Sequence, residues 1–556
     1  MDLEQYSAEE LDRARLFDPN LGCYNSAFKY WLQEFKDCYP TLKTYGRPKT
    51  LQLEVLILNL YVCWYHDRNQ PLAIAKTRNK HKKDSRYNKR ITSTITDVIN
   101  DFLVGKLVSE KVGYSNTFTG KSRLTRILAT DYLGDNWFTE VPFQIFDIRP
   151  YELDEPIVMK DEKFVDVMET VSIEPLIEFV DGVEIITDRY RQVPTGKQKK
   201  VKSIIDYKDT KLSKQWREEL KKYNQLLAVT PIDIGNLKEP YIDREPPKKD
   251  PTRQPTRIHI DSTNKYVKRV FNRESFDYGG RFYGGWWQQI PKDLRQHIRI
   301  GSERTIEIDY SGFHVALLYA KENISYYDKY GTQADPYDVH VPEVNDPDYR
   351  RWLIKQVMLT AVNAESVEKM CKAVQFADTP DDIDRPEGLS LTNELLIGIL
   401  DKLRDKHQPI AKHLCTGAGI ELQNTDSKIT AYLINKYTEE GICLLPVHDS
   451  YIVEEKYSGL LHRDMQDAVH NTLLEDGIDL TQVEVNLPQA EEPLNEQPHI
   501  KAKQLGYVDE LFDDEEEGGG EEHQEMIKIK HQHLTWCPEY VDRLNEFNYW
   551  LRNRKG

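Results

Sequence analysis

Two aspartates are the side chains of this sequence best suited to metal chemistry. Asp309 follows the apolar run TIEI, and Asp449 lies between two apolar runs in GICLLPVHDSYIVEE. Because Mg²⁺ prefers oxygen ligands, two such ions bound by carboxylates can stabilise both the attacking and the leaving oxygen of an in-line phosphoryl displacement. We predict that Asp309 and Asp449 meet and bind two Mg²⁺ ions, for which Mn²⁺ can substitute. Either aspartate alone would more often be a helix cap or a turn residue.

Strands are needed to bring the two aspartates together. The run before Asp309 is predicted to be a strand, and residues 442–455 are predicted to form a β-hairpin whose tip holds His448 and Asp449. If these strands lie side by side, both carboxylates face one metal site.

Residues 349–367 are predicted to form a helix that carries two cations. Arg351 and Lys355 are four residues apart and share a face, which continues with Leu359 and Asn363. This face could bind a triphosphate and then contact a sugar or base. A solvent-exposed helix with two positive charges is the plainer alternative.

Upstream, residues 273–300 combine four glycines, Arg281 and a Trp-Trp pair. Glycine permits close backbone approach, so Arg281 could reach a nucleic-acid groove. Lys265, Lys268 and Arg269 precede this segment and add positive charge where a duplex backbone could lie. The same segment could instead be a glycine-rich turn with aromatic residues in the core.

Taken in order, these motifs resemble the superfamily that unites A-family DNA polymerases with single-subunit phage-type RNA polymerases. The similarity covers about residues 258–460. The motifs are DYGGR (277–281), DYSGFH (309–314), RWLIK (351–355), LQNTDSKI (422–429) and VHDS (447–450). DPYDVH (335–340) lies where the family carries a short helix.

The resemblance implies an α+β right-hand polymerase, with an antiparallel palm sheet and helical fingers. It assigns catalysis and metal binding to Asp309 and Asp449, with Tyr310 as a further metal ligand through its carbonyl. The residues implied to bind the nucleotide are Arg351, Lys355, His314, Leu359 and Asn363. Those implied to bind nucleic acid are Arg281, Gln423 and His448. Lys265, Lys268 and Arg269 are predicted to bind it because of their positive charge.

Three positions depart from the DNA polymerases of this superfamily. His314 stands where they have a glutamate that blocks a ribose 2′-hydroxyl, Asn363-Ala364 replaces Tyr-Gly, and Ser450 gives the HDS of the RNA enzymes. A bulky His314 favours deoxynucleotides, whereas Asn363 could hydrogen-bond a ribose hydroxyl. The motif spacing and the DYS tripeptide favour DNA synthesis.

Four segments are predicted along the chain. The first is expected to be helical with a possible winged helix, in which a helix ends near Gly105, a hairpin follows and another helix starts near Lys121; a plain helical domain is the alternative. The basic run at 76–90 and a basic loop at 191–202 would dock nucleic acid. The predicted segments are 1–140 (nucleic-acid-binding), 141–257 (thumb-like or accessory region and linker), 258–500 (palm and fingers) and 501–556 (acidic disordered segment and C-terminal helix).

Composition limits the functional classes. A net charge of −17 argues against a protein with a wholly basic surface, and seven scattered cysteines without a C-x-x-C pair argue against a disulfide framework or zinc ribbon. No membrane span is expected, so a soluble intracellular (cytoplasmic) protein is predicted.

The predicted function is a template-directed DNA polymerase of a mobile element or virus, whose partners are a DNA template, a primer and dNTPs or rNTPs. Protein partners are unknown. The alternatives are a phage-type RNA polymerase or primase, a metal-dependent nuclease, and a non-catalytic DNA-binding replication initiator.

Overall fold

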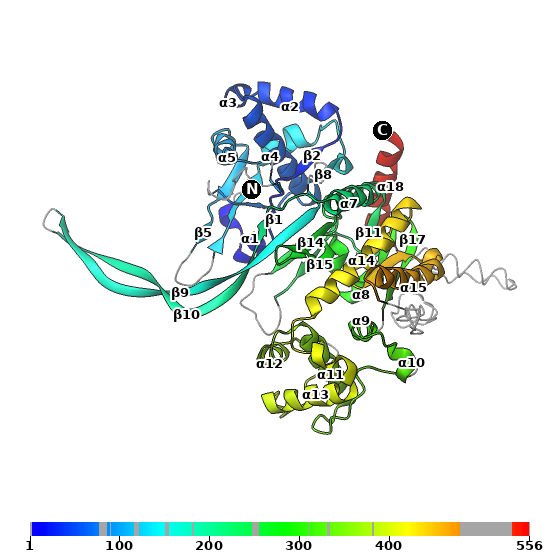
Figure 1. Cartoon of the computed structure of the whole chain (residues 1–556). Helices are drawn as coiled ribbons and strands as arrows, with labels where there is room; N and C mark the ends of the chain where they lie inside the picture. Colours follow the sequence, from blue (N-terminus) through cyan, green and yellow to red (C-terminus); the bar gives the residue numbers. More distant parts are fainter. Residues whose placement is uncertain are drawn as a thin grey trace, which may run out of the picture. The chain divides into compact units, whose positions relative to one another are not determined.

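The computed structural model contains two compact units, drawn in Figure 1. It describes residues 3–76, 86–88, 90–115, 122–150, 155–180, 183–246, 255–310, 312–330, 334–380, 383–478 and 536–554. The first unit contains residues 1–221 and 240–275, and the second contains 222–239 and 276–556. The chain therefore combines the first two predicted segments largely in one unit, and the C-terminal helix belongs to the same unit as the candidate site.

The first unit is built around a buried helix. Helix α4 (Arg47–His66) is apolar on most of its surface, as predicted for residues 51–67, and contributes to one core with α2 and α5. Its helices are α1 (Ala8–Asp12), α2 (Ala27–Asp37), α3 (Pro40–Lys43), α4, α5 (Ile95–Val104), α6 (Asp131–Leu133) and most of α7 (Lys211–Val229). Its short strands are β1 (Arg15–Leu16), β2 (Leu21–Cys23), β3 (Leu72–Ile74), β4 (Val108–Lys111), β5 (Tyr114–Ser115), β6 (Ser122–Arg123), β7 (Thr125–Ala129), β8 (Ile148–Pro150), β12 (Tyr241–Arg244), β13 (Thr256–His259) and β14 (Lys268–Asn272).

The winged-helix prediction is correct in its first half and wrong in its second. Helix α5 ends at Val104 with Gly105 as its C-cap. The helix predicted near Lys121 is instead strands β6 and β7, and β7 lies between β3 and β4 in a four-stranded sheet. All five residues of β7 are buried, so pairing on both sides favours a strand there.

A long β-hairpin follows where short strands and a basic loop were predicted. Strand β9 (Ile157–Val180) has 24 residues and β10 (Val183–Ile205) has 23, and they pair antiparallel along almost their whole length (Figure 1). The segment 191–202 is therefore strand rather than loop. Helix α7, which follows, was not predicted.

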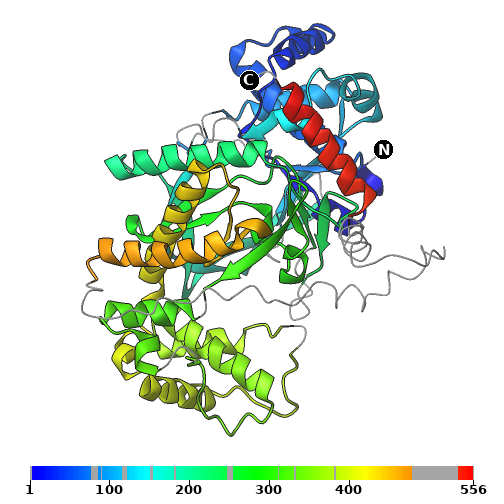
Figure 2. The same cartoon turned by 90° about the vertical axis from the view of Figure 1, so that its right-hand side faces the viewer.

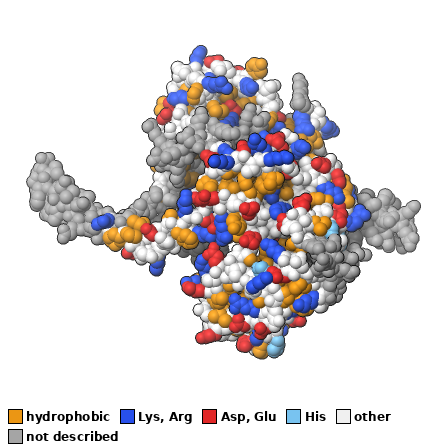
Figure 3. Space-filling view, viewed as in Figure 1, with side chains coloured by type: hydrophobic (Ala, Val, Ile, Leu, Met, Phe, Trp, Pro, Cys, Tyr) orange, Lys and Arg blue, Asp and Glu red, His pale blue; other side chains and the backbone are white. Residues whose placement is uncertain are grey.

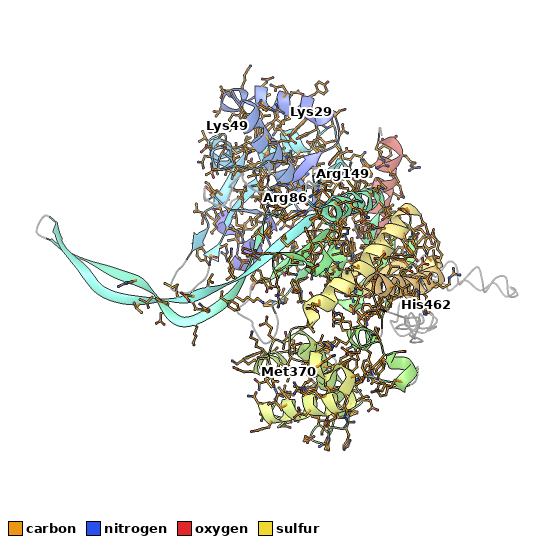
Figure 4. All side chains as sticks on the ribbon, in the orientation of Figure 1. Lys29, Lys49, Arg86, Arg149, Met370 and His462 are labelled. Atoms are coloured by element: carbon orange, nitrogen blue, oxygen red, sulfur yellow. The ribbon has the colours of Figure 1, made fainter. Side chains whose placement is uncertain are left out.

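The described cations of the 76–90 run are used inside the first unit. Arg86, labelled in Figure 4, donates to Glu155 and Asp209 at 3.2 and 3.1 Å, and its guanidinium lies 3.8 Å from the Tyr207 ring. Arg90 donates to Glu54 at 2.7 Å. Residues 77–85 and 89 lie outside the described residues. These ion pairs stabilise the fold, so the described part of the run gives no support to nucleic-acid docking.

The second unit is an antiparallel sheet with helices on it, which makes the chain a mixed α+β protein. The sheet order is β11-β16-β17-β19-β18. Its strands are β11 (Ile232–Ile234), β16 (Ile298–Ile300), β17 (Glu303–Asp309), β18 (Leu445–Val447) and β19 (Ser450–Glu454), and β15 (Ser275–Tyr283) leads into this unit. In Figure 2, α14 (Gly419–Glu439, yellow) and α15 (Ser458–Glu475, orange) cross in front of the green strands.

The remaining helices of the second unit precede β16, lie between β17 and α14 in sequence, or follow α15. They are α8 (Lys292–Arg295), α9 (Phe313–Lys321), α10 (Tyr326–Tyr330), α11 (Pro347–Asn363), α12 (Val367–Gln375), α13 (Asn393–Lys406) and α18 (Pro538–Asn553). Residues 335–340 contain a turn at 336–337 and not the short helix that the resemblance implied. Helix α18, predicted as a C-terminal helix, packs on the sheet edge, where Arg543 binds Asp233 with two hydrogen bonds. The acidic run 509–523 lies outside the described residues.

The surface has mixed charge. On the face drawn in Figure 3, blue Lys and Arg side chains alternate with red Asp and Glu over the described residues. Within the described part of the chain, none of the helices combines the length and hydropathy needed to cross a bilayer.

Candidate active site

The two predicted aspartates lie at one end of neighbouring strands. Strands β17 and β19 pair antiparallel, with Asp309 opposite Ser450, the residue that follows Asp449. Paired Cα atoms are ~4.5–5.5 Å apart and consecutive ones are 3.8 Å apart, so the Cα atoms of Asp309 and Asp449 lie within ~9 Å of each other. Asp309 is exposed and Asp449 is partly buried.

A tight turn presents Asp449, as predicted. Val447 pairs with Ser450, which leaves His448 and Asp449 as a two-residue hairpin loop. His448 has a φ of 60°, the positive value that the favoured two-residue hairpin turns require at their first central residue. A side chain other than glycine or asparagine is uncommon in this conformation, which is why such residues deserve a functional explanation.

The third side chain on this face is Glu307, which the sequence analysis missed. Residues two apart in a strand point to the same side, so Glu307 shares the face of Asp309. Arg295 donates to it at 2.9 and 3.1 Å, and the Ser450 hydroxyl donates to it at 2.7 Å. The alternation in TIEID would have identified it as a neighbour of Asp309.

Tyr310 is part of the core under this edge. Its ring stacks on Phe313 with centroids 4.4 Å apart, and its hydroxyl donates to the Met465 carbonyl at 2.6 Å. Because the side chain is buried, only backbone atoms of Tyr310 can serve a ligand at the surface. The metal-binding role that the resemblance implied for its carbonyl stays a prediction.

The glycine-rich segment packs against the hairpin that carries Asp449. Both Trp286 and Trp287 are fully buried, and the Trp287 ring nitrogen donates to the Pro446 carbonyl at 3.1 Å. A Cβ on Gly285 would lie 2.3 Å from the Trp287 ring, so only glycine fits there. Gly279 and Gly280 have φ values of 74° and 88°. The glycines therefore allow this segment to turn and to pack closely, and the tryptophans are core residues, as the structural alternative held.

Arg281 lies at the centre of a charged network. Its Nε donates to Asp426 Oδ2 at 2.7 Å, and its Nη2 lies 3.2 Å from His314 Nε2. Asp426 is completely buried on α14. Burial raises the pKa of Asp426 to about 7, with a further contribution from the negative charge of Asp449 and an opposing one from Arg281. Burial and the charge of Arg281 lower the pKa of His314 to about 4, against the effect of Asp449.

Asp426 is a second residue that the sequence analysis did not assign. It lies in the motif LQNTDSKI, whose four consecutive polar residues 424–427 are all buried in a helix. Buried polar side chains need partners, and this run finds some of them in the glycine-rich segment, since Asn424 donates to the Phe276 carbonyl at 2.9 Å. A run of polar residues between apolar helical positions is the signal that could have found Asp426. Gln423, the residue predicted to bind nucleic acid, is partly buried.

His448, in the two-residue turn of the hairpin, lies beside Tyr283. Their ring centroids are 5.9 Å apart with an interplanar angle of 66°. Partial desolvation lowers the pKa of His448, as does the charge of Arg281. Both effects favour the neutral form of His448.

The predicted cationic face exists on α11. Arg351, Lys355 and Asn363 are exposed and Leu359 is partly buried, whereas the opposite side of the helix is core. Arg351 pairs with Asp335. Asn363 donates to the Leu359 carbonyl at 2.8 Å, which uses one of its two amide hydrogens.

Helix α11 connects to the Asp426 network through the start of α14. A Cβ on Gly419 would lie 2.2 Å from the Asn363 Oδ1. Gly419 and Asp426 are seven residues apart on α14, about 10 Å along the helix axis. The end of the cationic helix and the charged network are thus held by one rigid element.

Two of the three cations predicted before this segment are buried in the first unit. Lys265 is 2% exposed and Arg269 is 3% exposed. The guanidinium of Arg269 lies 4.7 Å from the Trp216 ring and 5.0 Å from the Phe271 ring. A buried side chain does not reach a duplex backbone. The prediction that Lys265 and Arg269 bind nucleic acid is therefore corrected, and both side chains belong to the interior of the fold. Lys268 is partly buried.

The donor set at the strand ends fits a hard divalent cation. Among the described residues, no group of three or more His, Cys, Asp and Glu side chains is arranged to hold a metal ion. Magnesium sites for phosphate chemistry need only one or two carboxylates, because water and substrate phosphates supply the other ligands. Asp309, exposed at a strand end, and Asp449, in the adjacent turn, meet that requirement.

The chain has distant structural neighbours among solved proteins but no sequence relatives in the comparisons. No protein-family model matches the sequence, and no curated protein matches it. The chain is similar to a solved structure described as the POL domain of Pol1 from M. smegmatis in complex with a DNA primer-template and dNTP, at 12% sequence identity and a TM-score of 0.26. The match covers 47% of this chain and 49% of that chain, so it spans about half the length of each.

Proposed function

We propose that this protein is a template-directed nucleic-acid polymerase that adds nucleotides to a primer 3′ end, with DNA as the favoured product. The observation that carries the proposal is the pairing of β17 with β19, which puts Asp309 opposite the neighbour of Asp449. The ordered motifs that resemble the polymerase superfamily supply the reaction class.

Each group of residues has a part in this proposal. Asp309 and Asp449 would hold two Mg²⁺ ions, which would supply charge stabilisation at the attacking and leaving oxygens. Arg351 and Lys355 on α11 bind the triphosphate and orient it. Arg281 contacts the primer–template. Asp426 anchors it, and the negative charge of Asp449 also acts on it.

The deoxynucleotide preference rests on two side chains. His314 is held by Arg281 and cannot swing freely, so its ring limits the space beside a sugar. Asn363, the residue that could favour ribonucleotides, already donates to Leu359. RNA synthesis, as a polymerase or primase of the phage type, is the alternative.

The test is primer extension by the purified full chain with Mg²⁺. Primed and unprimed DNA templates are supplied separately with dNTPs or rNTPs. Wild type should extend the primer, and Asp309→Asn and Asp449→Asn should each lower the rate at least a thousandfold, while Asp467→Asn, an exposed acid on α15, should leave it unchanged. Extension by both active-site variants would refute the proposal. Cleavage without incorporation would favour a nuclease, and tight site-specific DNA binding without incorporation would favour an initiator.

The proposed contact of Arg351 and Lys355 with the triphosphate is tested by the apparent KM for the nucleotide. Arg351→Ala or Lys355→Ala should raise the apparent nucleotide KM about tenfold or more, because each removes a charge-assisted contact. Lys372→Ala, on the exposed side of α12, is the matched control. An unchanged KM in both α11 variants would remove the cationic face from the proposal.

A further inference from the structure

The buried carboxylate of Asp426 has one oxygen that the fold uses and one that it does not. Oδ2 accepts from Arg281 at 2.7 Å, while Oδ1 is buried without a hydrogen-bond partner in the described part of the chain. A carboxylate half-satisfied in this way is costly to bury, so a side chain retained for stability alone would be better replaced by an apolar one. Its position therefore needs an explanation beyond packing.

The contact from Arg281 determines the protonation of His314. A guanidinium has only donors and no acceptor. The contact between Arg281 Nη2 and His314 Nε2 at 3.2 Å is a hydrogen bond only if Nε2 accepts, which leaves the ring proton on Nδ1. Arg281 also disfavours a positive charge on His314, in the same direction as its lowered pKa.

The two contacts form a chain from the helix core to the site. Asp426 holds Arg281 through the hydrogen bond from Nε, and the Nη2 group of Arg281 in turn contacts His314. Because an arginine side chain is long, an unanchored guanidinium would move toward Asp449, whose charge also acts on it. The direction of Arg281 thus depends on the carboxyl group of Asp426, whose Oδ2 accepts from Nε.

We propose that Asp426 is a positioning residue, which acts through Arg281 to hold His314 neutral with its proton on Nδ1. His314 then offers one fixed N–H donor. In the proposed reaction, and resting on it, this donor faces the bound nucleotide, because His314 lies on α9 directly after the strand end that carries Asp309.

The first experiment observes the tautomer without requiring any activity. The full chain is labelled with ¹⁵N-histidine, and the His314 signals are assigned by their loss in His314→Gln. In wild type at pH 7, Nε2 should have the shift of an unprotonated nitrogen and Nδ1 that of a protonated one. Asp426→Asn should convert His314 to a mixture of tautomers or to the Nε2-protonated form. Asp464→Asn, which changes another buried acid of the second unit paired to Lys436, should not.

The tautomer experiment can fail or succeed independently of primer extension, so it tests the role of Asp426 separately from the proposed function. A His314 tautomer unchanged in Asp426→Asn overturns the inference whatever the activity. If Asp426→Asn does not fold, Arg281→Lys serves instead, since lysine keeps the charge but lacks the fork that reaches both partners. The tautomer should change there too, and an unchanged tautomer again overturns the inference.

A second experiment tests the action on the nucleotide. If wild type extends a primer, Asp426→Asn should change the ratio of kcat/KM for dNTP and rNTP about fivefold or more. The double variant Asp426→Asn with His314→Ala should give the same ratio as His314→Ala alone, because the effect of Asp426 on the choice between dNTP and rNTP passes through His314. Additive effects would overturn this part. Wild type without any extension refutes the proposed function, whereas the tautomer result still decides the positioning role.

Discussion

Asp426→Asn should remove a pH dependence from the stability of the second unit. The pKa of Asp426 is 3.8 in an ordinary environment and about 7 in the fold. Between these values the folded protein keeps a proton that the unfolded chain has released. The folded state then binds more protons than the unfolded state, so the free energy of unfolding falls as pH rises through this window.

The size of the effect follows from the shift. Each pH unit within the window changes the free energy of unfolding by about 1.4 kcal/mol, and integration from pH 5 to pH 8 gives a loss of about 2–3 kcal/mol. His314 acts in the opposite direction: its pKa falls from 6.5 to about 4, so its contribution is present above pH 6.5 and is lost as pH falls toward 4. Both proteins retain His314, so its contribution largely cancels in the difference between wild type and variant.

The assay is urea-induced unfolding of wild type and Asp426→Asn at pH 5, 6, 7 and 8, followed by far-ultraviolet circular dichroism. Hydrogen exchange measured by mass spectrometry identifies the transition that contains α14. The stability of wild type relative to the variant should fall by about 2–3 kcal/mol between pH 5 and pH 8. Asp467→Asn, at an exposed position of α15, should show no such trend. A difference that stays flat or rises with pH would refute the reasoning about burial at Asp426.

Two further predictions concern the parts that hold the site. Gly285→Ala should destabilise the second unit by about 1–3 kcal/mol in urea unfolding, because the new Cβ would lie 2.3 Å from the Trp287 ring; Gly459→Ala, with no atom within 4 Å of its Cβ, is the control, and equal effects would contradict the steric argument. Ser450→Ala should cost about 1 kcal/mol through the lost hydrogen bond to Glu307, whereas Ser450→Thr should retain part of it; an unchanged midpoint in Ser450→Ala would show that this bond adds nothing.

Local pattern was sufficient for the elements that carry the predicted chemistry. The hairpin with Asp449 at its tip was predicted because apolar runs flank a two-residue turn, and turn and strands are adjacent in sequence. The helix of Arg351 and Lys355 was predicted because a four-residue repeat is helical by geometry alone.

Where pairing partners are distant in sequence, local pattern was misleading. A helix was predicted to start near Lys121. The fold forms β6, which pairs with β5, and β7, which lies between β3 and β4. Residues 191–202 were predicted as a loop, because lysines and glycine suggested solvent, yet they pair with β9. Strand formation depends on a neighbour that the segment itself does not contain.

The sequence alone determined which residues could bind metal and phosphate, since those abilities belong to the side chains of Asp309, Asp449, Arg351 and Lys355. Only the tertiary structure decided their surroundings. It showed that Lys265 is buried, that Arg295 and Ser450 both donate to Glu307, and that Asp426 contacts Arg281, 145 positions away in sequence. Burial and long-range charge contacts exist only in the folded chain. The pKa and the orientation of a side chain follow from them rather than from its neighbours along the sequence.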